Sequence, residues 1–168
     1  MAAGEPPPQT YVPGNLLPFS LDAATLTPIA GFSVDARVLS REDYDRGRES
    51  DLSPTDLALG WDRMADDAVI AALDISQPSR WYRYHWSDQP PLPPREIASS
   101  SANMHMIPGS DAIAQTLAGV RQGERVRIDG WLVEAEARDG WRWRSSTSRT
   151  DTGGGTCEVI YVCGITRL

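Results

Sequence analysis

The sequence predicts an α+β fold: a curved antiparallel sheet or a small open β-barrel of the OB-like kind, with two or three short helices. Two observations lead to this prediction. Segments in which apolar and polar residues alternate occur around residues 31–40 and through the last third of the chain, and such alternation is typical of half-buried strands. Gly130 lies inside one of these segments, where it favours a bulge or sharp coiling of the kind that bends a sheet into a barrel.

The first half of the chain combines one strand with helical signals. In GFSVDARVLS, residues 31–40, apolar and polar side chains alternate as in a half-buried strand. Ser53 and Pro54 have the residue types preferred at the N-cap and first position of a helix. We therefore expect helical pieces over residues 55–61 and 63–74. The aromatic run SRWYRYHW, residues 79–86, is rich in residues that favour strands.

The second half is predicted to be mainly β. REIASSSANMHMIP, residues 95–108, reads as an irregular strand, and Ser110 or Asp111 is expected to cap a short helix. Asp139-Gly140 is a hairpin signal between two further strands. The expected strands of this half are RVRIDGWLVEAEA, WRWRSSTS and CEVIYVCGITRL.

The chain of 168 residues is long enough for one domain with a hydrophobic core. Residues 1–18 are expected to form a proline-rich flexible tail, and residues 19–168 a single α+β domain. No segment approaches the roughly 20 apolar residues of a membrane span, and the N-terminus lacks the pattern of a signal peptide. As the chain stands, we expect a cytoplasmic protein.

Charge and residue usage exclude several classes of function. The net charge is −7, and an acidic surface repels phosphate backbones, which argues against nucleic-acid binding. All 16 basic residues are arginine, so lysine-based chemistry such as a Schiff base or a P-loop is excluded. The two histidines and two cysteines lack the short spacings of a zinc site. We expect neither a metal nor a cofactor.

A set of motifs resembles an uncharacterised family of bacterial proteins. VLSREDY, DLALGW, SANMHMIP and GWRWRSS followed by RTDTGGGTCE occur in the order found in that family, and the resemblance covers about residues 30–163. The family has no established activity, so the resemblance supplies no catalytic residues. Because its members often carry a membrane segment before a proline-rich linker, it implies a membrane-anchored or periplasmic location as the alternative to the cytoplasm.

His105 is the first candidate for chemistry. On a strand, Asn103 and His105 share a face, because side chains alternate. An imidazole can serve as base for a cysteine nucleophile, and an asparagine can orient that imidazole. Cys157 follows the glycine-rich TDTGGGT, whose N–H groups would suit an oxyanion. Cys157, His105 and Asn103 therefore form a candidate thiol-hydrolase triad, and the alternative is that His105 is a packed polar residue and Cys157 a small core residue.

The two cysteines are not expected to pair with each other. If CEVIYVC is a strand, Cys157 and Cys163 lie on one face with Cα atoms about 20 Å apart. A disulfide requires a separation below about 7 Å.

The most distinctive feature of the sequence is arginine interleaved with aromatic residues. Such surfaces bind proteins or peptides, because Trp and Arg are the usual anchors of interfaces, and they also suit carbohydrate or single-stranded nucleic acid. The alternative is that these side chains only stack across strands and stabilise the sheet. The candidate binding residues are Trp81, Arg83, Trp141, Trp143, Arg144 and Arg149.

From these observations the sequence favours a non-enzymatic accessory module that engages a protein or peptide partner through its aromatic and arginine residues. A cysteine hydrolase or transferase using Cys157 and His105 is the first alternative. An OB-like single-stranded nucleic-acid binder is the second.

Overall fold

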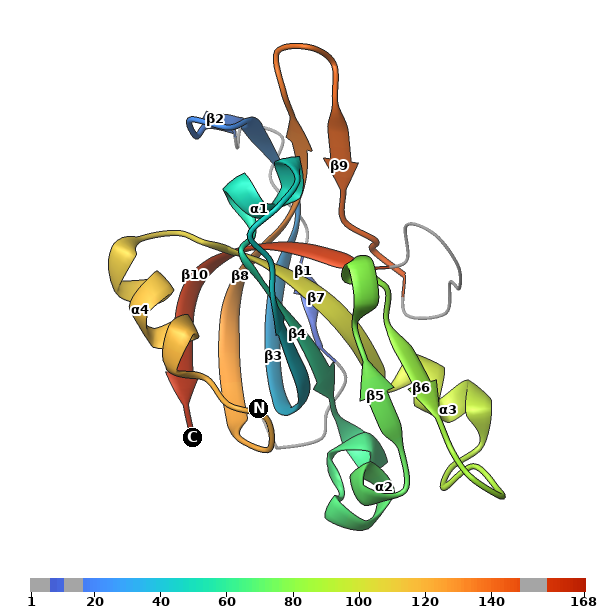
Figure 1. The fold of residues 1–168 in the computed structure, drawn as a ribbon. Helices are drawn as coiled ribbons and strands as arrows, with labels where there is room; N and C mark the ends of the chain where they lie inside the picture. The colour runs from blue at the N-terminus through green and yellow to red at the C-terminus, as the bar shows by residue number, and fades with distance from the viewer. Residues whose placement is uncertain (1–6, 11–16, 149–156) are drawn as a thin grey trace.

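The structure, a computed structural model, describes residues 7–10, 17–148 and 157–168. Within these ranges the chain folds into strands and short helices arranged around one large curved sheet (Figure 1). The predicted α+β class is therefore confirmed, with four short α-helices where two or three were expected.

The elements are as follows. The strands are β1 (Gln9–Thr10), β2 (Phe19–Ser20), β3 (Thr25–Asp43), β4 (Thr55–Gly60), β5 (Asp74–Ser76), β6 (Arg83–His85), β7 (Ser101–Pro108), β8 (Arg125–Glu136), β9 (Arg142–Arg144) and β10 (Glu158–Arg167). The helices are α1 (Arg48–Leu52), α2 (Asp67–Ala71), α3 (Pro94–Ser99) and α4 (Asp111–Gly119), with 3-10 turns η1 (Asp62–Ala65) and η2 (Pro78–Arg80).

Five strands close into a ring of hydrogen bonds. The order is β3–β4–β7–β10–β8, and β8 pairs again with β3. All of these pairs are antiparallel except β7 with β10, which is parallel. Helix α4 connects β7 to β8. A five-stranded ring of this kind is OB-like, although the curved sheet as a whole does not form a clean barrel.

Bulges allow the sheet to curve. Strand β3 is 19 residues long and changes register against both of its neighbours, so it can pair with β4 at one end and β8 along its length. On β10 the register shifts between Val162 and Gly164, so that Cys163 is the extra residue opposite Gly130 and Asp129. The irregularity predicted at Gly130 is therefore present, and the additional residue is in the partner strand.

The ring encloses the main hydrophobic core. Alternate residues of its strands point inward, among them Leu57 and Leu59 of β4 and Met104 and Met106 of β7. The opposite face of the same strands is covered by other parts of the chain. Residues such as Ile107 and Val159 pack there beneath Trp141 and Trp143, and Ala58 packs beneath the β5–β6 hairpin region. The ring thus has an apolar interior and a partly covered outer face.

The helix predicted over residues 55–61 is wrong. Residues Thr55–Gly60 form strand β4, which pairs with β3 on one side and β7 on the other, and all six residues are buried. A short run buried on both faces shows no alternation, so its periodicity does not distinguish a strand from a buried helix. Helical structure in the next segment is limited to η1 and α2.

Other predictions can be compared directly. Helix α4 begins after Ser110, whose side chain accepts a hydrogen bond from the Ile113 N–H, as expected for an N-cap. Of the strand expected over residues 95–108, residues 101–108 form β7, whereas its first part is wrong, because residues 95–99 belong to helix α3. Cys157 and Cys163 do not form a disulfide with each other. Much of the expected tail lies outside the described residues, although Gln9–Thr10 pairs with β3. No helix in the described part of the chain is long and apolar enough to cross a membrane.

Candidate functional site

Polar side chains gather on the outer face of β4 and β7. Asp56 is paired with His105 across these strands, and Asn103 lies two residues before His105 on the same face. All three are almost fully buried, with 0%, 4% and 1% of their surfaces exposed. Because burying polar groups is costly unless they are paired, their partners define the site.

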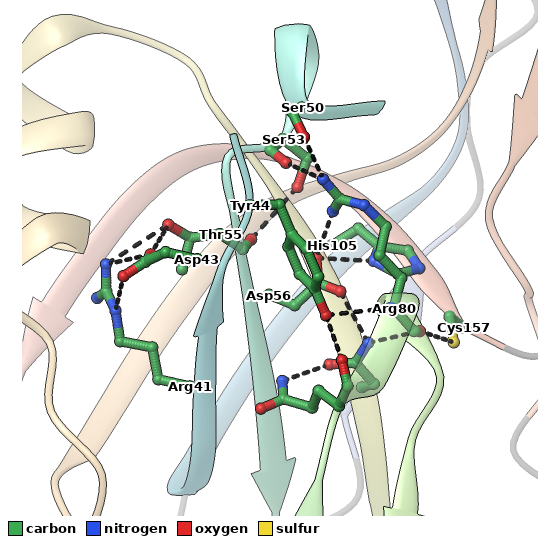
Figure 2. Close-up of polar contacts among 12 residues, drawn as sticks. Arg41, Asp43, Tyr44, Ser50, Ser53, Thr55, Asp56, Arg80, His105 and Cys157 are labelled. Atoms are coloured by element: carbon green, nitrogen blue, oxygen red, sulfur yellow. Dashed lines mark hydrogen bonds and ion pairs between the residues drawn. The ribbon is translucent and has the colours of Figure 1, made fainter. Parts of the chain in front are cut away.

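Asp56 is the centre of the cluster (Figure 2). Its Oδ1 lies 2.7 Å from Nη1 of Arg80 and 2.8 Å from Nδ1 of His105. Its Oδ2 accepts a hydrogen bond of 3.0 Å from Nδ2 of Asn103. The contact with His105 is a close approach in ion-pair range and not a well-directed hydrogen bond. It leaves Nε2 as the ring nitrogen that can serve a ligand.

Arg80 covers the carboxylate from the side of η2. Its guanidinium also donates to the Ser53 carbonyl at 2.7 Å, and its carbon Cζ lies over the rings of Tyr44 and Trp143, at 4.2 and 5.5 Å from their centroids. Ser79 and Arg80 both adopt left-handed backbone conformations, with φ of 52° and 67°. Such conformations are costly for residues other than glycine and are typical of sites where the surrounding structure imposes them.

Hydrogen bonds to the backbone hold this strained segment in place. The Tyr44 hydroxyl donates to the Gln77 carbonyl and accepts a hydrogen bond from the Arg80 N–H. The Gln77 amide donates to Oδ1 of Asn103 at 2.7 Å, and Nδ2 of Asn103 donates to the Arg80 carbonyl at 3.2 Å. Asn103 of β7 is therefore bonded to η2 through the Arg80 carbonyl and also to the carboxylate of Asp56.

A pocket of about 550 Å³ opens above this cluster. His105 and Arg80 line its floor, the ring of Trp143 lies 4.7 Å from that of His105, and Trp81 is half exposed at the rim. The pocket is lined by Tyr44, Arg46, Glu49, Ser79, Arg80, Trp81, His105, Trp143, Arg144 and Cys157. It therefore lies between the β3–β4 and β8–β10 connections, over β4 and β7.

The structure brings most of the predicted site residues together. Cys157, His105, Trp81, Trp143 and Arg144 line the pocket, although they come from four separate parts of the sequence.

The other predicted residues lie beside or away from the pocket. Asn103 lies next to its floor, bonded to Asp56 and Arg80. Trp141 packs beside Trp143 with centroids 6.2 Å apart, while Arg83 is exposed on β6 and does not line the pocket. Arg149 and the glycine-rich TDTGGGT lie outside the described residues.

Sequence reasoning missed Asp56, Tyr44 and Gln77. The signal for Asp56 was present: it is the one acid within the otherwise apolar run TDLALG. Had that run been interpreted as a buried strand, an acidic residue inside it would have required a buried partner. Among the described residues, no group of His, Cys, Asp and Glu is arranged to hold a metal ion.

No protein-family model matches the chain, and no curated protein or solved structure is significantly similar to it. The interpretation of this pocket therefore depends on its geometry and on the chemistry of its residues.

The stability of the cluster is expected to depend on the ionisation of Tyr44. Burial, together with the nearby negative charge of Asp56, raises the pKa of Tyr44 to about 12. The ordinary tyrosine pKa is about 10, so the folded protein holds this proton more tightly than the unfolded chain. The stabilisation is complete below about pH 10 and is lost as the pH rises toward 12.

Tyr44→Phe tests this expectation. The variant should be less stable than the wild type at pH 8, because it loses two hydrogen bonds, and its free energy of unfolding should fall less steeply between pH 10 and 12. Urea unfolding across this pH range measures both effects. Burial also raises the pKa values of Tyr82 and Tyr84, but these residues affect the pH dependence of stability equally in the wild type and the variant. If the unfolding free energy falls equally steeply with pH in the two proteins, the pKa of Tyr44 is not raised in the folded state.

Proposed function

We propose that the protein is a binding module that holds a protein or peptide partner in the pocket above Asp56 and His105. The observation that supports this most is the meeting of Trp81, Trp143 and Arg144 at one pocket from two distant connections. Trp81 is 52% exposed, one of three large apolar side chains with such exposure in the described residues. An exposed tryptophan beside a pocket is a usual anchor for a partner.

The position of the pocket supports the same proposal. In OB-folds, ligands bind over the second and third strands between the first and last long connections. In this ring those strands are β4 and β7, and the connections are residues 44–54 and 137–157. The analogy with OB-folds does not determine the function, since one fold hosts many functions. It identifies which face of the barrel is suited to binding.

The chemistry of the rim indicates what a partner would present. Trp81 and Trp143 offer flat apolar surfaces, which suit an aromatic or branched aliphatic side chain. Arg144 is 60% exposed in its side chain and pairs with Glu134 through Nη1, while Arg46 is almost fully exposed. These arginines suit a carboxylate next to the apolar residue. A short peptide segment with one apolar and one acidic residue therefore fits the site.

Selection from a phage-displayed library of random dodecapeptides tests the proposal. We expect enriched peptides to share an apolar and an acidic residue, and to bind the purified protein in calorimetry. Trp81→Ala should weaken that binding about 30-fold or more, the loss typical of a central anchor. Arg83→Ala is the matched control, because Arg83 is exposed but does not line the pocket, and should change the affinity less than twofold. Equal effects of the two substitutions would contradict the proposed site.

Single-stranded nucleic acid is a second candidate partner, which the OB-like ring and the aromatic and arginine rim favour. The net charge of −7 argues against it. A fluorescent oligothymidine at 50 mM salt separates the two candidates. Binding that weakens steeply between 50 and 200 mM salt would replace the peptide proposal, because counterion release is specific to the phosphate backbone.

A further inference from the structure

The floor of the pocket contains a His105–Asp56 pair that the proposed peptide binding does not require. His105 is 4% exposed, yet it lines the pocket, and the buried carboxylate of Asp56 lies 2.8 Å from its Nδ1. The negative charge of a carboxylate beside Nδ1 stabilises the imidazolium, so that Nε2 can accept and return a proton.

Cys157 is placed near this histidine by the parallel pairing of β10 with β7. In that register Val159 is opposite His105, and Cys157 lies two residues before Val159, just ahead of the start of β10. Sγ of Cys157 and Nδ2 of Asn103 both contact the Arg80 carbonyl, at 3.9 and 3.2 Å. Cys157 and His105 line the same pocket.

The surrounding groups favour a reactive thiol. Reactive cysteines occur in partly exposed, electropositive surroundings beside a histidine or arginine. Cys157 is half-buried, and the Arg80 side chain lines the same pocket. In the present structure Sγ points to the Arg80 carbonyl. Catalytic hydrogen bonds are often long in the absence of substrate, so this orientation of Sγ is compatible with a reactive role for Cys157.

We infer that Cys157 is a nucleophile served by the Asp56–His105 pair, and that the pocket hydrolyses an acyl ester or thioester. Asp56 is the positioning residue, in place of the Asn103 expected from the sequence, because the hydrogen bonds of Asn103 go to Asp56, Arg80 and Gln77. Asn103 and Arg80 in turn hold the carboxylate of Asp56.

The reaction proceeds in two steps. Nε2 of His105 removes the proton from Cys157, and the thiolate attacks the carbonyl carbon of the substrate. A carbon–sulfur bond forms, the bond to the leaving alcohol or thiol breaks, and the leaving group takes the proton from Nε2. Water then gives a proton to Nε2 and its oxygen attacks the thioester. The carbon–sulfur bond breaks, the acid is released, and the proton returns to Sγ.

The rate of alkylation by iodoacetamide tests the activation of the thiol. In a Cys163→Ser background Cys157 is the only cysteine. At pH 7 we expect it to react about tenfold faster than N-acetylcysteine, because more of it is thiolate. His105→Gln should lower the rate to that of the reference thiol, and Asp56→Asn should lower it several-fold. His85→Gln, at the other histidine of the chain, is the matched control and should have no effect.

The direction of the change distinguishes activation from a structural role. Loosening the pocket would expose Cys157 and raise its alkylation rate, whereas losing the base lowers it. The apparent pKa of the thiol, from the pH dependence of the rate, should rise in His105→Gln and Asp56→Asn. Other ionisable groups at this pocket, unchanged in these variants, are Tyr44, Arg46, Glu49, Arg80 and Arg144. If Asp56→Asn does not fold, His105→Gln decides alone.

The acyl step is tested with p-nitrophenyl acetate. We expect a burst of one nitrophenolate per protein and an acetyl group on Cys157 in mass spectrometry, both absent in Cys157→Ser. A wild-type alkylation rate equal to that of N-acetylcysteine, or no effect of His105→Gln on a folded protein, would overturn the inference. Peptide binding is measured separately on Cys157→Ser, so failure of the proposed binding function is recognised independently.

Cys163 provides an internal comparison. Partial burial of the thiol and the nearby Asp129 raise the pKa of Cys163. Less of it is thiolate at neutral pH, so in a Cys157→Ser background it should react more slowly than N-acetylcysteine, although the residue is exposed. A faster reaction at Cys163 than at Cys157 would remove the evidence for selective activation.

Discussion

Replacement of Asp56 by alanine is expected to reduce the free energy of unfolding by about 3–5 kcal/mol, the usual cost of removing one partner from a buried ion pair. The side chain of Asp56 has no exposed surface, and both of its oxygens are used. Its loss leaves the guanidinium of Arg80, only 14% exposed, without a carboxylate. Because Arg80 lies in a strained backbone segment, that segment loses one of its anchors as well.

The effect is measured as the shift in the urea unfolding midpoint at pH 7. Asp139→Ala is the matched control, since Asp139 also pairs with an arginine, Arg48, at 2.8 Å. That pair is exposed, with 49% and 61% of the two side chains accessible, so its loss should shift the unfolding midpoint much less than the loss of Asp56 does. If the two variants are destabilised equally, the Asp56 cluster is open to water and does not fix the pocket floor.

Much of the fold could be predicted because most of the ring strands have one apolar and one polar side locally. The alternation in residues 31–40 and 125–137 identified parts of β3 and β8, and the strand around His105 was also expected. The order of the ring could not be predicted, because it depends on pairings between distant segments. The closure of β3 on β8 joins residues about a hundred positions apart, and no local pattern specifies that register.

The site could be predicted only in part, because local alternation of apolar and polar residues reveals some of its residues and not others. His105 and Asn103 were recognised because both lie on a strand with a clear polar face. Asp56 was missed because β4 is buried on both sides and Ser53-Pro54 resembles a helix start. Tyr44 and Gln77 come from connections, whose conformations are set by contacts with the rest of the protein and not by their own periodicity.

Replacement of Gly130 by alanine is expected to destabilise the protein by about 3 kcal/mol, the upper part of the range for overpacked sites. A Cβ atom at Gly130 would overlap the backbone carbonyl oxygen of Tyr161 and lie 3.0 Å from the carbonyl carbon. Backbone atoms cannot rotate aside as a side chain can, so β10 itself must move. Urea unfolding at pH 7 measures the loss, and hydrogen exchange of the β10 amides locates it.

Gly164→Ala is the matched control on the same pair of strands. Gly164 is paired with Asp129, next to Gly130, but a Cβ atom there would meet no atom within 4 Å. We expect a change below about 0.5 kcal/mol. The comparison tests the closed ring, because β10 is held by β7 on one side and β8 on the other and cannot shift without breaking one of these pairings. If Gly130→Ala is as mild as Gly164→Ala, β10 is free to move away from β8, and the barrel is an open sheet at this point.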